Sequence, residues 1–364
     1  MIGKTQAIGA VRHMVMVFFV AVTCPLDIRA WAADLPLPGT TVGMAAYRKS
    51  ISTIEKRVFF VTNRKSTATR VLSQQFGDEV SDAPSFGVAR VNLAAASEDD
   101  RFVKSEVRSI SRLSKTELPA SLNSHPYKSS NTIVFVHGFN TSFDAAVRGA
   151  AEFRRNVHAE GPIVVVSWTS QNRWIRYLRD EEEVDLAVTM LSGLLTDLAG
   201  SQSRKVQIVA FSMGSRAVVK ALRRIFDSSE RGALSQVSQI VLAAPDINRD
   251  TMDADMLPVL EASKIPTTLY VADPDFWSWL SGVIHSKERV GGLSPSSIYT
   301  RPSITTIDVS NVDKSVTGHP AVFESPAVWS DLYYLLNRGL QASQRRQLQR
   351  IEINSGEYWR FRQL

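Results

Sequence analysis

From residue 131 onward, the chain alternates between short apolar runs and stretches whose apolar residues recur at helical spacing. The apolar runs are rich in β-branched residues and hydrophobic at consecutive positions, which is typical of strands buried on both faces of a parallel sheet. These runs cover residues 132–136, 163–167, 206–210, 239–243, 267–271 and 304–308. The helical stretches cover residues 143–158, 184–198, 215–226, 251–262 and 327–338. The alternation predicts an α/β fold, with a doubly wound, mostly parallel sheet and helices on both faces.

The two ends of the chain follow this pattern less clearly. Residues 57–62 and 86–93 have the apolar content of strands, whereas residues 101–130 are polar and predict a loop with a short helix. The expected organisation is a lead-in over residues 33–56, one main domain over residues 57–340 and a basic, peripheral tail over residues 341–364.

The first residues of the chain predict a secretory signal. Lys4 and Arg12 precede an apolar run over residues 14–22, and a small-residue site, Ala30-Trp-Ala32, follows. This order is typical of a signal peptide, and the apolar run is short for a membrane span. We expect residues 1–32 to be a signal cleaved after Ala32 or Ala33, with an uncleaved anchor as the alternative. The protein is then exported, periplasmic or secreted, and contacts a membrane only through this segment if it is retained.

Composition narrows the chemistry. The net charge of +6 is spread along the chain of 364 residues, so it does not indicate nucleic-acid binding. Cys24 is the single cysteine and lies in the predicted signal, so the mature chain is expected to lack disulfides, a cysteine nucleophile and cysteine-bound zinc. The histidines are scattered and no glycine-rich phosphate loop follows residues 132–136, so no cofactor and no metal site are implied. The oligomeric state has no signature in the sequence.

The strongest candidate for chemistry is Ser212, between a predicted strand and a predicted helix. Ala210 and Gly214 stand two residues before and after it, which makes a variant of the G-x-S-x-G nucleophile elbow. In such an elbow the sharp turn crowds the flanking side chains and holds the serine hydroxyl away from the backbone. The five-residue pattern is common by itself, but its place between strand and helix favours a catalytic serine over an ordinary turn.

A serine nucleophile needs a base to take its proton and an acid to orient that base. Doubly wound sheets bind ligands at the carboxyl ends of their strands. His319, in a glycine-bearing loop beyond the last predicted strand, is the expected base, with His285 in reserve. Asp275, after the strand 267–271, is the expected acid, and the second choices are Asp273 and Asp246. The resulting chain order, Ser–Asp–His, is the order found in α/β-hydrolases.

The remaining parts of a hydrolase site can also be assigned. The expected oxyanion donors are the backbone amides of Met213, Phe139 and Asn140. His137 is expected to brace the oxyanion loop rather than to abstract a proton. An acyl pocket is expected to include His137, Trp168, Phe276 and Trp277. A helix that packs its tryptophans onto the sheet fits the segment around residue 277 equally well.

Several motifs occur together over residues 57–340. They are Val61-Thr-Asn-Arg64, Val134-Phe-Val-His-Gly-Phe-Asn-Thr-Ser-Phe143, Val166-Ser-Trp168, Phe211-Ser-Met-Gly214, Ala244-Pro-Asp-Ile247, Arg289-Val-Gly291 and Gly318-His319. Together they resemble the bacterial α/β-hydrolase family called domain of unknown function 900, whose members are described as esterases or lipases, often with an N-terminal signal or anchor. The resemblance implies the α/β-hydrolase fold, with Ser212 as nucleophile, Asp275 as acid and His319 as base.

The chain departs from that family's pattern at two places. Phe211 stands where the family has a histidine before the nucleophile, and this removes a polar neighbour of Ser212. Thr169 stands where the family has the proline of a Trp-Pro-Ser motif. Neither change removes a member of the expected triad.

The sequence therefore predicts a serine hydrolase that cleaves carboxylic esters of small molecules or lipids through an acyl-enzyme. Esterase, lipase, thioesterase and acyltransferase remain open within that class. The alternative is a catalytically weak, hydrolase-like scaffold that binds a partner or an envelope component, because a fold does not by itself establish an activity. The complete set of candidate triad residues favours the enzyme.

Overall fold

The computed structural model describes residues 57–93, 105–124, 131–170, 177–201, 204–272, 289–291, 298–312 and 325–363. For residues 177–183 it describes the backbone alone. The described part lies within one compact unit, Lys49–Leu364. The expected signal and lead-in fall outside the described residues.

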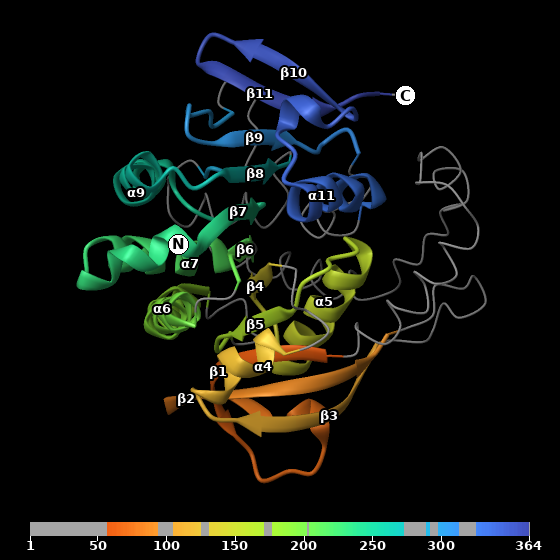
Figure 1. Cartoon of the computed structure of the whole chain (residues 1–364), viewed down its shortest axis with the longest axis vertical. Helices are drawn as coiled ribbons and strands as arrows, with labels where there is room; N and C mark the ends of the chain where they lie inside the picture. Colours follow the sequence, from red (N-terminus) through yellow and green to blue (C-terminus); the bar gives the residue numbers. More distant parts are fainter. Residues whose placement is uncertain are drawn as a thin grey trace, which may run out of the picture. The chain divides into compact units, whose positions relative to one another are not determined.

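A single sheet of 11 strands, in the order β10-β11-β9-β8-β7-β6-β4-β5-β1-β2-β3, runs through the described part of the chain (Figure 1). The strands are β1 (Arg57–Ser66), β2 (Phe76–Asn92), β3 (Glu106–Leu113), β4 (Thr132–Val136), β5 (Ile163–Ser167), β6 (Val206–Phe211), β7 (Val237–Ala243), β8 (Thr267–Val271), β9 (Thr305–Asp308), β10 (Leu348–Ile353) and β11 (Gly356–Phe361). From β1 across to β11 each neighbouring pair is parallel. The pairs β1–β2, β2–β3 and β10–β11 are antiparallel.

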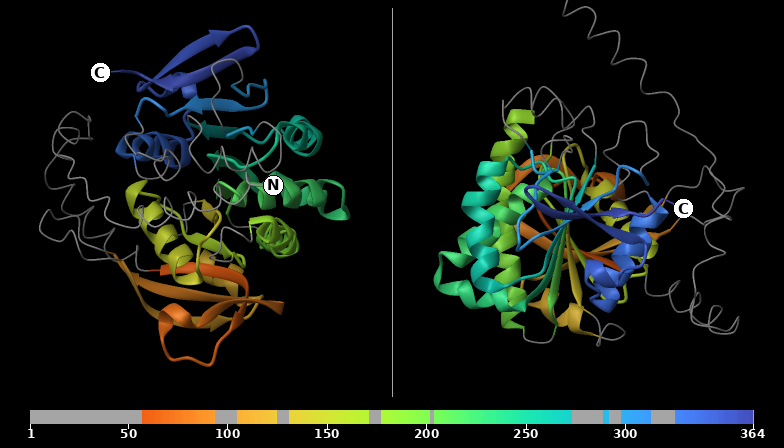
Figure 2. Two further views of the ribbon diagram at one scale, coloured as in Figure 1. Left: turned by 180° about the vertical axis from the view of Figure 1, so that it is seen from behind. Right: turned by 90° about the horizontal axis from the view of Figure 1, so that it is seen from above.

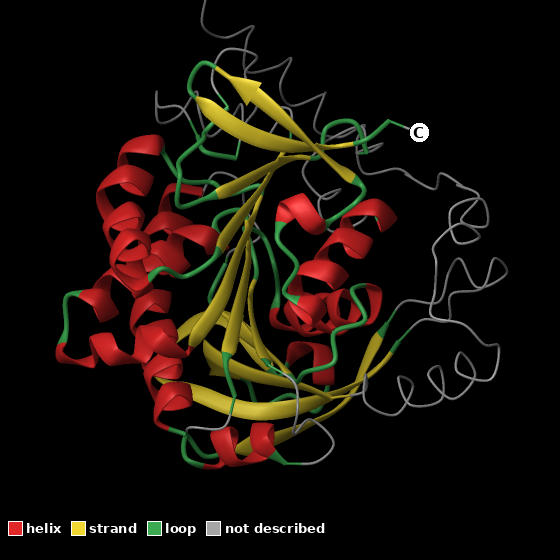
Figure 3. Cartoon of the chain, turned by 45° about the horizontal axis from the view of Figure 1, so that its top comes forward, coloured by secondary structure: helices red, strands yellow, loops and turns green. Residues whose placement is uncertain are grey.

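Helices cover both faces of this sheet, as Figures 2 and 3 show. One face carries α6 (Tyr177–Gly200), α7 (Gly214–Phe226) and α9 (Leu257–Ser263), and the other carries α5 (Phe143–Asn156) and α11 (Pro326–Arg338). The shorter elements are α4 (Glu117–Asn123), α8 (Arg249–Thr251), the π-helical turn η5 (Met252–Met256), and the 3₁₀ turns η1 (Leu72–Gln74), η4 (Ser229–Gln236) and η6 (Ala342–Gln344). No helix in this described part is both long and apolar enough to cross a membrane.

The alternation of side chains along each strand divides the core into two layers. On β4, Val134 and Val136 pack in the cluster that includes α6 and α7, whereas Ile133 and Phe135 pack in the cluster that includes α5 and α11. Because successive side chains of a strand point to opposite faces, a strand covered by helices on both sides must be apolar throughout. This confirms the predicted α/β fold, and the bounds of β4, β5 and β8 match the predicted runs.

Two segments differ from their prediction. The stretch 101–130, expected as a loop with a short helix, contains the edge strand β3 as well as α4. The tail 341–364, expected to be peripheral, instead forms the β10–β11 hairpin, and β11 pairs with β9. The basic residues of this segment made its strands hard to predict from the sequence. Two of them pair with buried carboxylates of the domain: Arg345 with Asp331 and Arg360 with Asp308.

Candidate active site

Ser212 occupies the turn between β6 and α7. Its φ is +50°, a left-handed value that is uncommon outside glycine and that characterises the strained serine of a nucleophile elbow. Its backbone is fixed on both sides: the Ser212 amide donates to Ala243 O at 2.9 Å, and the Ser212 carbonyl accepts from Asp246 N at 3.2 Å. The turn therefore has the backbone geometry that the sequence pattern predicts.

Two glycines let this elbow lie against the loop after β4. A Cβ added to Gly214 would lie 2.4 Å from His137 O, and one added to Gly138 would lie 3.1 Å from both Ser212 Cβ and Phe211 Cδ1. The first distance forbids any side chain, so Gly214 is required for the approach of the elbow to the end of β4. The predicted nucleophile and the predicted oxyanion loop are thus in direct van der Waals contact.

The oxyanion loop, residues 137–141, is held by a dense set of hydrogen bonds. His137 Nδ1 lies 2.8 Å from Gly138 O, and the single hydrogen of the Thr141 hydroxyl is shared between Gly138 O at 3.3 Å and Phe139 O at 3.1 Å. The exposed Asn140 has a φ of +55°, and its amide donates to Ser170 Oγ at 2.7 Å. Of the two amides predicted as donors from this loop, the one at Asn140 is therefore already engaged.

His137 and Trp168 are stacked on each other beneath this loop. Their rings are 5.2 Å apart and inclined by 5°, and the Trp168 indole donates to His137 O at 3.0 Å. His137 is 3% exposed and Trp168 is fully buried. Both rings are therefore packed in the described structure, and their expected place in an acyl pocket stays a prediction. Burial, with a contribution from the cation of Arg64, lowers the pKa of His137 to about 3, so its imidazole is neutral at physiological pH.

The end of β1 supplies three consecutive polar residues that the sequence reasoning did not assign to the site. The Thr62 hydroxyl donates to Ser167 O at 2.6 Å, and Asn63 Oδ1 accepts from Thr169 N at 3.0 Å. The side chain of Arg64 is fully buried, and its Nη2 donates to Thr141 O at 2.5 Å. The motif Val61-Thr-Asn-Arg64 was visible in the sequence, but nothing in it indicates that its side chains reach the oxyanion loop.

Asp246, a second choice for the orienting acid, forms ion pairs with two arginines. Its Oδ2 lies 2.9 Å from Arg216 Nη2, and its Oδ1 lies 3.2 Å from Arg289 Nε. Both arginine side chains are less than a tenth exposed. Since Asp246 N also donates to Ser212 O, this cluster braces the elbow from behind, and the carboxylate lies between two guanidinium groups.

Met213 follows Ser212 as the N-cap residue of α7, and it is fully buried. Its amide lies at the amino end of that helix, where the aligned peptide dipoles favour negative charge. The structure thus brings together Ser212, Met213, Phe139 and His137. The other predicted residues, Asp273, Asp275, Phe276, Trp277, His285 and His319, lie outside the described residues.

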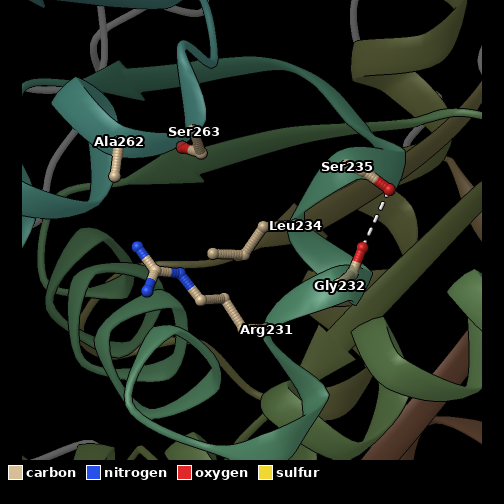
Figure 4. Close-up of a pocket in the computed structure, with 6 residues that line it drawn as sticks. All are labelled: Arg231, Gly232, Leu234, Ser235, Ala262 and Ser263. Carbon is tan, nitrogen blue, oxygen red and sulfur yellow. Dashed lines mark hydrogen bonds between the residues drawn. The ribbon is translucent and has the colours of Figure 1, made fainter.

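A small cleft elsewhere in the molecule does not belong to this site. It lies between η4 and α9 and is lined by Arg231, Gly232, Leu234, Ser235, Ala262 and Ser263 (Figure 4). The element η4 precedes β7 and α9 precedes β8, so the cleft lies near the amino ends of the parallel strands. Ser212 lies at their carboxyl ends.

The parallel sheet with helices on both faces, together with an elbow-like serine at the carboxyl end of β6, defines the class of protein as an α/β-hydrolase. Within that class, the family model described as "Alpha/beta hydrolase of unknown function (DUF900)" matches residues 113–337. This match spans more than half of the chain, and the protein belongs to that family.

Comparison with other proteins adds little beyond the family. No curated protein matches the chain. Among solved structures, it is similar to Aspergillus fumigatus lipase B, with 12% identity and a TM-score of 0.41 over 59% of this chain and 55% of the lipase. A Pyrobaculum calidifontis esterase has 12% identity and a TM-score of 0.37, over 87% of this chain and 100% of the esterase. A Bacillus subtilis carboxylesterase has 11% identity and a TM-score of 0.36, over 82% of this chain and 98% of that one.

Proposed function

We propose that this protein is a serine hydrolase that cleaves carboxylic esters, with Ser212 as its nucleophile. The observation that carries the proposal is the strained backbone of Ser212, with a φ of +50°, in a turn packed against Gly138 of the oxyanion loop. Strain of this kind persists where the surrounding structure enforces it, and it clusters at sites that use the residue chemically. The membership in an α/β-hydrolase family supports the same assignment.

In the proposed reaction, His319 takes the proton of the Ser212 hydroxyl while the serine oxygen bonds to the ester carbonyl carbon. Asp275 orients the imidazole and stabilises its charged form, and Asp273 is the second choice for this role. The tetrahedral intermediate expels the alcohol, which receives the proton from His319, and an acyl-enzyme remains. Water, deprotonated by His319, then attacks the acyl carbon, and the acid and free Ser212 are released.

The negative charge on the tetrahedral oxygen is proposed to be stabilised by the amides of Met213 and Phe139. Met213 N lies at the start of α7, and Phe139 belongs to the loop in contact with the elbow. Loss of one such donor costs about 3 kcal/mol of transition-state stabilisation. The proposed substrates are uncharged small-molecule or lipid esters.

A fluorophosphonate probe tests the nucleophile, because it reacts covalently with activated serines. Wild-type protein should be labelled, and Ser212→Ala should not. Ser215→Ala is a closely matched control, since Ser215 is fully buried one turn later and its hydroxyl has no hydrogen-bond partner within the described part of the chain. Labelling that persists in Ser212→Ala would remove Ser212 as the nucleophile. Folded wild-type protein that resists the probe would favour the alternative, a hydrolase-like scaffold that binds a partner or an envelope component.

The acid is tested separately by turnover of p-nitrophenyl esters of graded chain length. Asp275→Asn should reduce kcat by several orders of magnitude, whereas Asp273→Asn should reduce it little. The reverse result would transfer the role to Asp273. The same ester series distinguishes an esterase, which prefers short acyl chains, from a lipase.

We also propose that the protein is exported through residues 1–32. N-terminal sequencing of the protein recovered from periplasm and medium should show a mature chain that begins at Ala33 or Asp34. A chain recovered intact in the membrane fraction would instead support a retained anchor.

A further inference from the structure

The peptide between Gly138 and Phe139 is the part of the oxyanion loop whose orientation is fixed most directly. Its carbonyl oxygen, Gly138 O, lies 2.8 Å from His137 Nδ1 and accepts from the Thr141 hydroxyl at 3.3 Å. A trans peptide is planar, and its C=O and N–H point in opposite directions. Donors that anchor the oxygen therefore also fix the direction of the Phe139 amide hydrogen.

This peptide lies directly against the elbow. A Cβ added to Gly138 would be 3.1 Å from Ser212 Cβ, so the backbone at Gly138 lies close to the side chain of the proposed nucleophile. The next amide along the loop, at Asn140, donates to Ser170 Oγ at 2.7 Å. The amide of Asn140 is therefore engaged within the loop, whereas the Phe139 amide belongs to the peptide that lies against the elbow.

The imidazole of His137 is itself held in a single orientation. It is stacked on Trp168, whose indole donates to His137 O at 3.0 Å, and it is 3% exposed. A carbonyl oxygen accepts but cannot donate, so a hydrogen bond to Gly138 O requires the tautomer with its hydrogen on Nδ1. The other nitrogen, Nε2, is buried and has no hydrogen-bond partner among the described residues, and the backbone of Trp168 also acts on the ring.

We infer that His137 is a positioning residue of the hydrolase: its Nδ1–H holds Gly138 O so that the Phe139 amide points at the oxyanion formed on the ester. The inference rests on the proposed function of Ser212. A hydrogen bond to the carbonyl oxygen also polarises the peptide and strengthens its N–H as a donor. His137 acts through this peptide and exchanges no proton with the substrate.

The test compares His137→Leu, which has no donor, with His137→Asn, whose side-chain amide can place an N–H near the position of Nδ1. The readouts are the rate of fluorophosphonate labelling and the kcat and KM for p-nitrophenyl butyrate. His137→Leu should slow labelling and kcat by roughly 100-fold with KM nearly unchanged, since one oxyanion donor is worth about this factor. His137→Asn should recover most of the loss. A wild-type rate in His137→Leu, or equal losses in both variants, would overturn the inference.

Thr141→Val keeps the inference testable if His137→Leu does not fold. Thr141 is only partly buried, and the variant removes the weaker of the two donors to Gly138 O. Labelling should slow about threefold, and an unchanged rate in the folded variant would contradict the inference. His158→Asn, which changes an exposed histidine with a φ of +48° to a residue that tolerates this conformation, is the control and should react like wild type.

An NMR measurement separates this inference from the proposed function. Long-range ¹H–¹⁵N spectra assign the His137 tautomer in the folded protein without any substrate. A hydrogen on Nδ1 supports the hydrogen bond to Gly138 O, and a hydrogen on Nε2 overturns it. A protein with the Nδ1–H tautomer that does not react at Ser212 would refute the hydrolase but leave the loop geometry standing.

Discussion

The two ends of the sheet differ in their relation to the candidate site. Each end carries antiparallel strands added to the parallel core, β2 and β3 at one end and β10 at the other. Each addition is tied to the core by an arginine whose side chain is at most 1% exposed: Arg64 at the first end and Arg345 at the second. Arg64 binds the oxyanion loop through Thr141 O, whereas Arg345 binds Asp331 of α11, on a helix that contributes none of the candidate residues.

The second end is a self-contained buried network. Asp331 accepts hydrogen bonds from Arg345, from the Tyr270 hydroxyl at 2.6 Å and from Gln347 at 2.8 Å. Burial and the neighbouring carboxylate raise the pKa of Tyr270, so its hydroxyl remains a donor. We therefore expect a buried arginine to contribute to stability alone at the second end, and to both stability and the proposed chemistry at the first end.

Breaking the network at Asp331 should have the largest effect on stability. Arg345→Met leaves a fully buried carboxylate without its cation, and removal of one partner of a buried pair typically costs about 3–5 kcal/mol. Urea unfolding monitored by circular dichroism should show this loss, while the folded variant keeps the wild-type labelling rate. Arg360→Met, which removes a 41% exposed arginine from Asp308, should cost clearly less. A slower labelling rate in folded Arg345→Met would contradict the expectation that Arg345 contributes to stability alone.

Substitution of Arg64 should affect stability and labelling together. Arg64→Met leaves Thr141 O and Ser167 Oγ without their donor, and unsatisfied buried groups of this kind cost about 3 kcal/mol in total. Because Thr141 closes the oxyanion loop, labelling by the fluorophosphonate should also slow, by about tenfold. Arg64→Lys should not restore either property, since an ammonium group lacks the fork of donors that reaches Asp78, Ser167 and Thr141 at once. Full labelling in a destabilised Arg64→Met would mean that the two ends are equivalent.

The buried imidazole of His137 should make stability depend on pH near neutrality. Its pKa is about 3 in the folded protein and about 6.5 in the unfolded chain, so only the unfolded state gains a proton as the pH falls below 6.5. Stability from this group is complete above that value and is lost progressively toward pH 3. Between pH 7 and pH 5 the free energy of unfolding should fall by about 2 kcal/mol. Urea titrations at the two values measure this fall, which His137→Asn should remove. A slope retained in that variant would place the titration in other groups.

The parallel core could be predicted from the sequence, but the additions and their contacts could not. Strands β4, β5 and β8 are apolar on both faces, and this leaves a continuous hydrophobic run that marks their bounds. The edge strand β3 has a mixed burial pattern because one of its sides is exposed, so its residues read as a polar loop. The basic residues of 341–364 suggest a peripheral tail, because the sequence does not reveal that Arg345 pairs with Asp331 and Arg360 with Asp308.

The candidate site shows the same division. The turn at Ser212 is a local feature, and its neighbours Ala210 and Gly214 reveal it in the sequence. The role of Arg64 depends on a contact with Thr141, 77 positions away along the chain, and no local pattern encodes such a contact. The commitment of Asp246 to two arginines was hidden for the same reason, because Arg216 and Arg289 come from separate elements.

The smallest effect is expected next to Arg64 itself. Lys65 pairs with Glu79 at 2.8 Å, one residue beyond the Arg64–Asp78 pair on the same two strands. The side chains of Lys65 and Glu79 are both exposed. Exposed ion pairs contribute little, because water solvates each charge nearly as well as the partner does. Glu79→Gln should therefore leave the unfolding midpoint and the labelling rate unchanged, and added salt should make no difference between variant and wild type. A loss comparable to that of Arg64→Met would mean that the hairpin of β1 and β2, rather than the buried guanidinium, supports the oxyanion loop.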